Sequence, residues 1–178
     1  MCRKIVVNKA SHAEILDQAS GLMTLASCEE SKTRNLVLTT IRDLSANACN
    51  RHSLVKKNAV TILISLLDHS DHITKTLVTA TLRHLSSDQD LQAKIMADDI
   101  IIKAASLILG ASTDFLSQLA GLLANLSEDD GNRCRMVKLG VISALAVLSR
   151  ARSVDILLVS IKRNTVSLFS RYLLSTTF

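Results

Sequence analysis

Apolar residues recur along the chain four and then three positions apart, and the same stripe appears three times. The first stripe consists of Val37, Ile41 and Leu44. Because residues at these spacings share one face of an α-helix, each stripe predicts a helix that buries one side. The three predicted helices lie near residues 33–45, 74–86 and 115–127.

The stripes return at a constant period of 41 residues, and each ends in the dipeptide Leu-Ser. Two shorter apolar segments lie between successive stripes, joined at Asn58 in the first case and at Asp99 in the second. Gly140 holds the same position after the third stripe. These residue types tolerate the left-handed backbone conformation at a helix end. One repeat is therefore predicted to contain two short helices and a longer third.

The period divides the chain into units of similar length. A single unit cannot bury its apolar face, so stacked neighbours are expected to form one continuous core within a single all-α domain, 1–178. We predict a degenerate first repeat at 8–48, repeats at 49–89, 90–130 and 131–165, and a C-terminal cap or edge helix at 166–178.

Two stretches of the chain resemble the armadillo repeat family. Gln118–Asn132 is similar to the family's third helix and following loop, and Lys138–Leu145 is similar to its G-[AV]-I-x-x-L junction. A period near 41 falls within the range of armadillo and HEAT arrays, and the absence of proline favours armadillo. The resemblance covers about residues 8–165. It implies an armadillo-type right-handed superhelical solenoid of three-helix repeats, whose third helices line a concave groove.

The same resemblance indicates where a partner would bind. In relatives that act as nuclear-import adaptors, an Asn late in the third helix bonds the backbone of an extended peptide, and a Trp four residues earlier forms slots for basic side chains. The Asn position holds Asp43, His84 and Asn125 here, and the Trp is absent. This departure argues against a nuclear-import adaptor and leaves a more general protein-interaction scaffold as the predicted function.

Arg42 and Arg83 occupy equivalent positions one repeat apart and could bind a carboxylate or phosphate together. Surface arginines without a ligand are the alternative, and the whole polar stripe would also suit the solvated face of three helices. The candidate partner-binding groove comprises Asn35, Thr39, Arg42, Asp43, Thr76, Arg83, His84, Ser117 and Asn125.

Charge is concentrated at the C-terminal end. Residues 1–131 hold 13 basic and 15 acidic side chains, whereas residues 132–178 hold 8 basic and one acidic. Such asymmetry favours an acidic partner, with an acidic protein segment ranked above RNA or an anionic membrane surface. RNA ranks lower because the interleaved aromatic residues of single-strand binders are missing. The predicted basic patch comprises Arg133, Arg135, Arg150, Arg152, Lys162 and Arg163.

The chain offers no arrangement typical of an enzyme. It contains neither a P-loop nor a nucleophile elbow, and aromatic residues make up only 2%. His69 and His72, with neighbouring aspartates, could offer ligands to a metal, but a polar interhelical turn is the preferred interpretation. No cofactor, metal or small-molecule substrate is therefore expected.

The cysteines and the hydropathy of the chain indicate the cellular compartment in which the protein is expected. None of the four cysteines forms a Cys-x-x-Cys pair, and no uncharged apolar run approaches the length of a membrane span. Reduced thiols in an intracellular protein, cytoplasmic or nuclear, are the expectation. The cysteines are Cys2, Cys28, Cys49 and Cys134.

Overall fold

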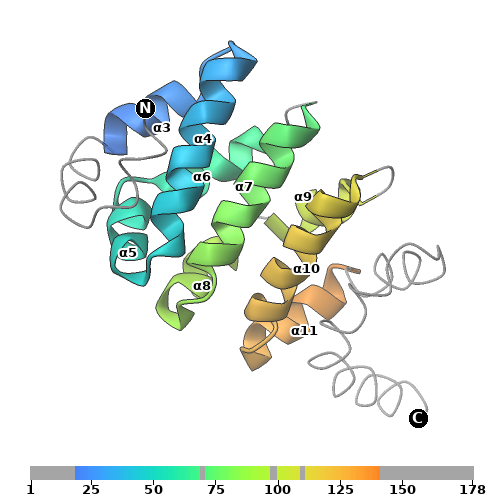
Figure 1. The fold of residues 1–178 in the computed structure, drawn as a ribbon. Coiled ribbons are helices and arrows are strands. Elements are labelled where there is room, and N and C mark those ends of the chain that lie inside the picture. Colours follow the sequence, from blue (N-terminus) through green and yellow to red (C-terminus); the bar gives the residue numbers. More distant parts are fainter. Residues whose placement is uncertain (1–18, 69–70, 97–99, 109–110, 141–178) are drawn as a thin grey trace, which may run out of the picture.

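A computed structural model describes residues 19–68, 71–96, 100–108 and 111–140 of the chain, and all regular secondary structure within these ranges is α-helical (Figure 1). Three helices are longer than the others: α4 (Ser31–Ala46), α7 (His72–Leu85) and α10 (Thr113–Leu126). They cover the three segments in which the apolar stripes predicted helices, so that prediction is confirmed.

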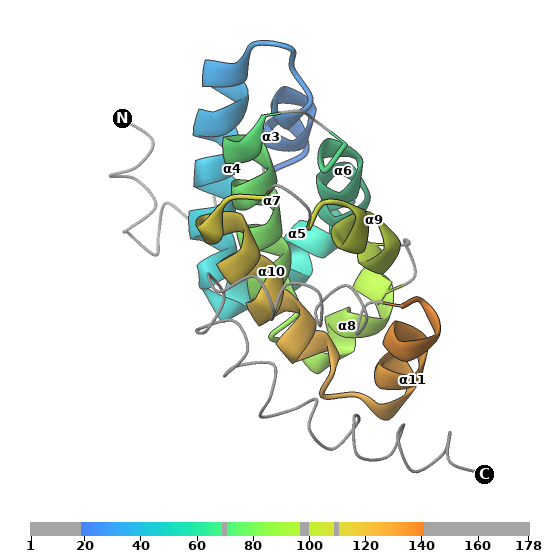
Figure 2. The ribbon, with the colours of Figure 1, turned by 90° about the vertical axis from the view of Figure 1, so that its right-hand side faces the viewer.

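The long helices lie side by side in one layer, with α7 packed between α4 and α10 (Figures 1 and 2). We call α4, α7 and α10 the third-helix layer. In Figure 2 the short helices lie to the right of this layer, and none of the helices that the structure describes covers its other face. They are α3 (Ala19–Ala26), α5 (Ala48–Lys56), α6 (Ala59–Leu66), α8 (Gln89–Met96), α9 (Ile100–Ser106) and α11 (Asp130–Lys138).

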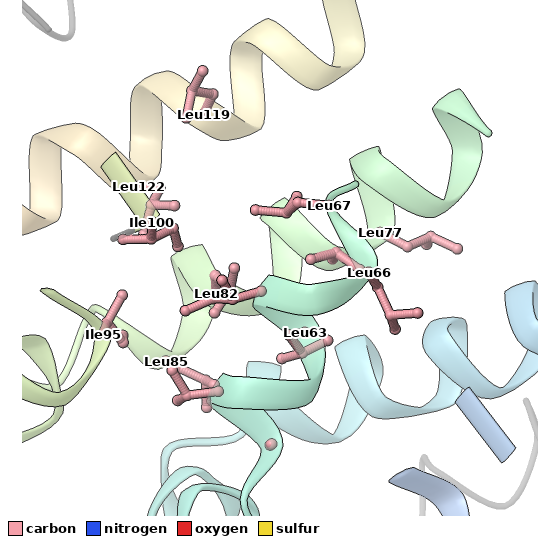
Figure 3. Close-up of a cluster of buried hydrophobic side chains, with 14 of the residues drawn as sticks. Leu63, Leu66, Leu67, Leu77, Leu82, Leu85, Ile95, Ile100, Leu119 and Leu122 are labelled. Atoms are coloured by element: carbon pink, nitrogen blue, oxygen red, sulfur yellow. The ribbon is translucent and has the colours of Figure 1, made fainter. Parts of the chain in front are cut away.

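The hydrophobic core runs without a break from one repeat into the next. All nine residues of the three apolar stripes are buried, and Val37, at 8% exposure, is the most exposed of them. Figure 3 shows how side chains from different helices converge, with Leu63 of α6 and Ile95 of α8 beside Leu82 and Leu85 of α7. Each buried leucine or isoleucine contributes about 1.5–3 kcal/mol, so stacking supplies the stability that no single repeat has.

The junctions between the short helices have the predicted backbone conformation. Asn58 precedes α6 with a φ of 63°, and Gly140 follows α11 with a φ of 73°. Both angles lie in the left-handed region, where Asn and Gly are the residues that fit best. Asp99, the third predicted junction residue, lies outside the described ranges.

Side chains in the loops fix where several helices begin. Asp71 accepts a hydrogen bond from the backbone N–H of Ile73 at 2.9 Å and so caps α7. Asp129 accepts from the N–H of Asn132 at 2.8 Å at the start of α11. Such bonds satisfy N–H groups that have no partner within the helix. The bond from Asp129 shows that the acidic loop after α10 caps the next helix.

Candidate partner-binding groove

The three helices of the third-helix layer share one arrangement at their C-terminal ends. A serine near each end donates its hydroxyl to the carbonyl three residues earlier, and all three serines are buried. The last carbonyls of a helix have few intrahelical partners, and the serine hydroxyls supply a donor to one of them at each end. The pairs are Ser45 with Arg42 at 2.6 Å, Ser86 with Arg83 at 2.8 Å, and Ser127 with Ala124 at 2.7 Å.

The first short helix of the next repeat supplies a second donor to the same ends. Arg51, Gln92 and Arg133 follow one another at the 41-residue period. They donate to the carbonyls of Ser45, Ser86 and Ser127 at 3.0, 3.1 and 2.7 Å, respectively. Arg51 and Gln92 were not predicted from the sequence, although a long polar side chain at each 41-residue step was a usable signal.

The predicted groove residue Asn125 faces the preceding helix of the layer. Its Nδ2 donates to the Arg83 carbonyl at 3.0 Å and lies 3.0 Å from Ser86 Oγ and 3.2 Å from Ser87 Oγ. These bonds tie α10 to the end of α7. Asn125 therefore has a structural role, and its contact with a partner stays a prediction.

His84 occupies the equivalent position one repeat earlier and makes the equivalent contacts. Its Nδ1 lies 3.3 Å from the Arg42 carbonyl and 3.0 Å from Ser45 Oγ. A carbonyl oxygen can only accept, so Nδ1 donates to the Arg42 carbonyl in the tautomer that carries its proton on Nδ1. Burial lowers the pKa of His84, and the charges on Arg83, Arg51 and Arg42 lower it further, which outweighs the raising effect of the hydrogen bond. The ring is therefore neutral near pH 7.

Replacing Asn125 with alanine is expected to lower the free energy of unfolding by about 1–2 kcal/mol, because the partly buried acceptors at the end of α7 lose the donor that ties them to α10. Ser117→Ala, at an exposed position of the same helix, should change it by less than about 0.5 kcal/mol. Urea denaturation measures both values. An Asn125→Ala protein as stable as the Ser117→Ala protein would contradict the structural role.

A buried cluster joins the N-terminal ends of α4 and α7. Arg34 is only 2% exposed. Its Nε donates to Thr74 Oγ1 at 3.2 Å, and its Nη1 donates to the carbonyls of Cys28 at 3.0 Å and Glu29 at 3.2 Å. Its Nη2 lies 3.8 Å from Asp71 Oδ2. The guanidinium group thus connects α7 to the loop that precedes α4.

Asn35, another predicted groove residue, belongs to this cluster. Its Nδ2 donates to Asp71 Oδ2 at 3.2 Å, and its Oδ1 lies 2.9 Å from Thr74 Oγ1. Burial raises the pKa of Asp71, but hydrogen bonds from Thr74, Ile73 and Asn35, together with the charge of Arg34, bring it below the ordinary value. The ionised carboxylate therefore holds both the cap of α7 and the contact with α4.

Three other predicted residues are more open to solvent. The hydroxyl of Thr39 donates to the Asn35 carbonyl at 2.7 Å, and that of Thr76 donates to the His72 carbonyl at 2.9 Å. Both threonines are partly exposed, and Ser117 is exposed. Among the predicted groove residues, these three side chains take the smallest part in contacts between repeats.

The two equivalent arginines differ in their surroundings. Arg42 turns to Asp43 of its own helix, with Nε at 2.9 Å and Nη2 at 2.5 Å from Oδ1. Arg83 instead reaches α10, where its Nη1 donates to Gln118 Oε1 at 2.9 Å. Gly121 leaves room for this side chain, since a Cβ at that position would lie 2.6 Å from Cδ and Nε of Arg83. The structure therefore does not bring the two guanidinium groups onto one ligand.

The sequence profile of the kinesin-associated protein (KAP) family matches residues 6–168. The chain belongs to this family. Solved structures with a similar fold support the armadillo assignment, which the resemblance had predicted. No curated protein sequence matches this KAP-family chain.

Structures similar to this chain include those of engineered and designed proteins. An engineered protein aligns with a TM-score of 0.77 and 17% identity over 88% of this chain and 65% of its own. A designed armadillo repeat protein in complex with the peptide (KR)4 aligns with a TM-score of 0.73 and 15% identity over 81% of this chain and 64% of its own. The KAP-family chain thus has the armadillo fold and spans less than two thirds of either protein.

The basic patch predicted for this KAP-family chain is described only in part. Arg133 Nη1 donates to two carbonyls at the end of α10, and the same side chain pairs with Asp130. Part of its charge is thereby already neutralised. Arg135 is exposed on α11. Arg150, Arg152, Lys162 and Arg163 lie outside the described ranges, so the patch as a whole stays a prediction.

The cysteines and histidines of the described ranges form no metal centre. No three His, Cys, Asp or Glu side chains gather there in a way that could hold an ion. Cys28, Cys49 and Cys134 are free thiols. His72 is exposed at the start of α7, and His69, its predicted companion, is not among the described residues. None of the described helices is long and apolar enough to span a bilayer.

Proposed function

We propose that this KAP-family chain is a non-enzymatic interaction scaffold that binds an extended protein segment across the uncovered face of the third-helix layer. The observation that carries the proposal is a row of polar side chains at the 41-residue period. Asn35, Thr76 and Ser117 occupy the same position on three adjacent helices, and all are at least partly exposed. A repeating row of this kind suits a ligand that is itself extended.

The armadillo fold supports the proposal in a second way. One of the similar designed proteins was solved with a peptide bound, and another was designed for modular peptide recognition. Neighbouring helices of the layer in this chain are fixed to one another by the Arg34 cluster and by Asn125. A rigid layer loses little conformational entropy on binding, which favours affinity.

A pair of matched serine variants tests the proposal. Ser117→Trp adds a bulky side chain to the exposed face of α10, and Ser65→Trp adds the same side chain to an exposed position of α6. Peptides selected from a random library against the wild-type chain are expected to bind Ser117→Trp about tenfold more weakly or worse, which is 1.4 kcal/mol. Their affinity for Ser65→Trp should not change.

Isothermal titration calorimetry gives both affinities. Peptides that lose affinity for Ser65→Trp while keeping it for Ser117→Trp would place the binding surface on the short helices and refute the proposal. Equal affinity for all three proteins would also refute it, provided that thermal unfolding shows both variants to be folded.

A further inference from the structure

Arg42 and Arg83 hold the same position in consecutive repeats, yet only one of them is neutralised. Asp43 pairs with Arg42, and both side chains are less than one-third exposed. The residue equivalent to Asp43 in the next repeat is His84, whose ring is neutral near pH 7. Within the described part of the chain, Arg83 forms no ion pair with a carboxylate. The positive charge at this position is thus neutralised in one repeat and is not neutralised in the next.

Arg83 is also held in a defined position. Gln118 accepts from Nη1 at 2.9 Å and fixes the guanidinium group without cancelling its charge, because an amide is neutral. Gly121 lets the side chain lie across α10, where any Cβ would intrude. The one acidic residue of α10, Asp114, lies two helical turns from Gly121, about 10 Å along the axis. The surroundings are therefore electrostatically suited to an anion.

We propose that Arg83 anchors a carboxylate of an acidic protein segment that lies across α7 and α10. This inference rests on the function proposed above and names the chemistry of the partner. A guanidinium group has five N–H donors in a planar fork. One of them bonds Gln118, and the others can bind a carboxylate with two parallel hydrogen bonds. The (KR)4 peptide in the complex of the similar designed protein is basic. Arg83 would give this chain a preference for the opposite charge.

Two synthetic peptides test the inference on the full chain. One alternates Glu with Ser, and the other alternates Gln with Ser. The acidic peptide is expected to bind wild-type protein more tightly, and Arg83→Gln should weaken that binding about five- to tenfold. Lys56→Gln is the control and should alter the affinity less than about twofold, because it removes the same unit charge from an exposed position on the short helix α5. A heteronuclear NMR titration gives both the affinity and the location of binding.

A second variant keeps the positive charge of Arg83 but changes its position. Gly121→Ala introduces a Cβ that displaces Arg83, and alanine favours the helix. This variant should also weaken binding of the acidic peptide, and it decides the question if Arg83→Gln does not fold. If neither variant weakens binding, or if Lys56→Gln weakens it equally, the inference is overturned.

The NMR shifts separate this inference from the proposed function. Shifts on α4, α7 and α10 with no dependence on Arg83 would overturn the anchor and leave the binding surface in place. Shifts confined to α5, α8 or α11 would overturn both. No binding of the acidic peptide, or tighter binding of a single-stranded RNA oligomer at Arg83, would show that an acidic protein segment is the wrong partner.

Discussion

Replacing Leu85 with alanine is expected to lower the free energy of unfolding by about 2–5 kcal/mol. Leu85 ends the apolar stripe of α7 and is 0% exposed, enclosed by the continuous core of neighbouring repeats. The truncation removes buried methyl groups and leaves a cavity that stacked helices fill only in part. Urea denaturation followed by circular dichroism measures the loss.

Leu36→Ala is the matched control for this prediction. Leu36 lies on α4 and is 54% exposed, so its truncation should change the stability by less than about 1 kcal/mol. Similar losses for the two variants would mean that Leu85 does not lie in a packed core. That outcome would contradict the stacking of repeats on which the fold depends.

Replacing Arg34 with methionine is expected to lower the free energy of unfolding by about 3 kcal/mol. Methionine keeps much of the side-chain volume but removes the donors to Thr74 and to the carbonyls of Cys28 and Glu29. It also leaves Asp71 without the nearby positive charge. Breaking a buried ionic group by removing one member costs about 3–5 kcal/mol, and the partial exposure of Asp71 places the value near the lower limit.

Arg42→Met tests whether the loss of stability expected for Arg34→Met is due to the burial of Arg34. Arg42 is on the same helix and also pairs with an aspartate, but its side chain is 29% exposed. Exposed pairs contribute about 0–1 kcal/mol, so this variant should remain close to wild type. If thermal unfolding shows equal losses for Arg34→Met and Arg42→Met, the buried cluster is not what stabilises the N-terminal ends of the layer.

The helices could be predicted from the sequence because each depends on a pattern that lies within it. Val37, Ile41 and Leu44 define a buried face without reference to the rest of the chain. The backbone conformation of Asn58 and Gly140 followed from residue type alone. Comparison at the 41-residue period then gave the architecture, since equivalent residues must occupy equivalent places.

The candidate site was harder to predict because its contacts join different repeats. Asn125 was expected to face a partner, but its amide donates to the end of α7, a contact visible only once α10 is stacked on α7. Arg34 resembles any charged surface residue in sequence, and only the folded loop at Cys28 and Glu29 explains its burial. A polar contact can be predicted only when the neighbouring residues in three dimensions are known, whereas apolar periodicity can be recognised within one helix.

The capping of the third helices makes neighbouring repeats unequal in their dependence on one another. Gln92 and Asn125, which close the end of α7, both come from farther along the chain, and Arg51 does the same for α4. Loss of a repeat by proteolysis or by a gene deletion would therefore remove donors from the backbone carbonyls at the end of the described third helix before it. The described repeat after it would instead lose side-chain partners, as Asp71 would lose Arg34.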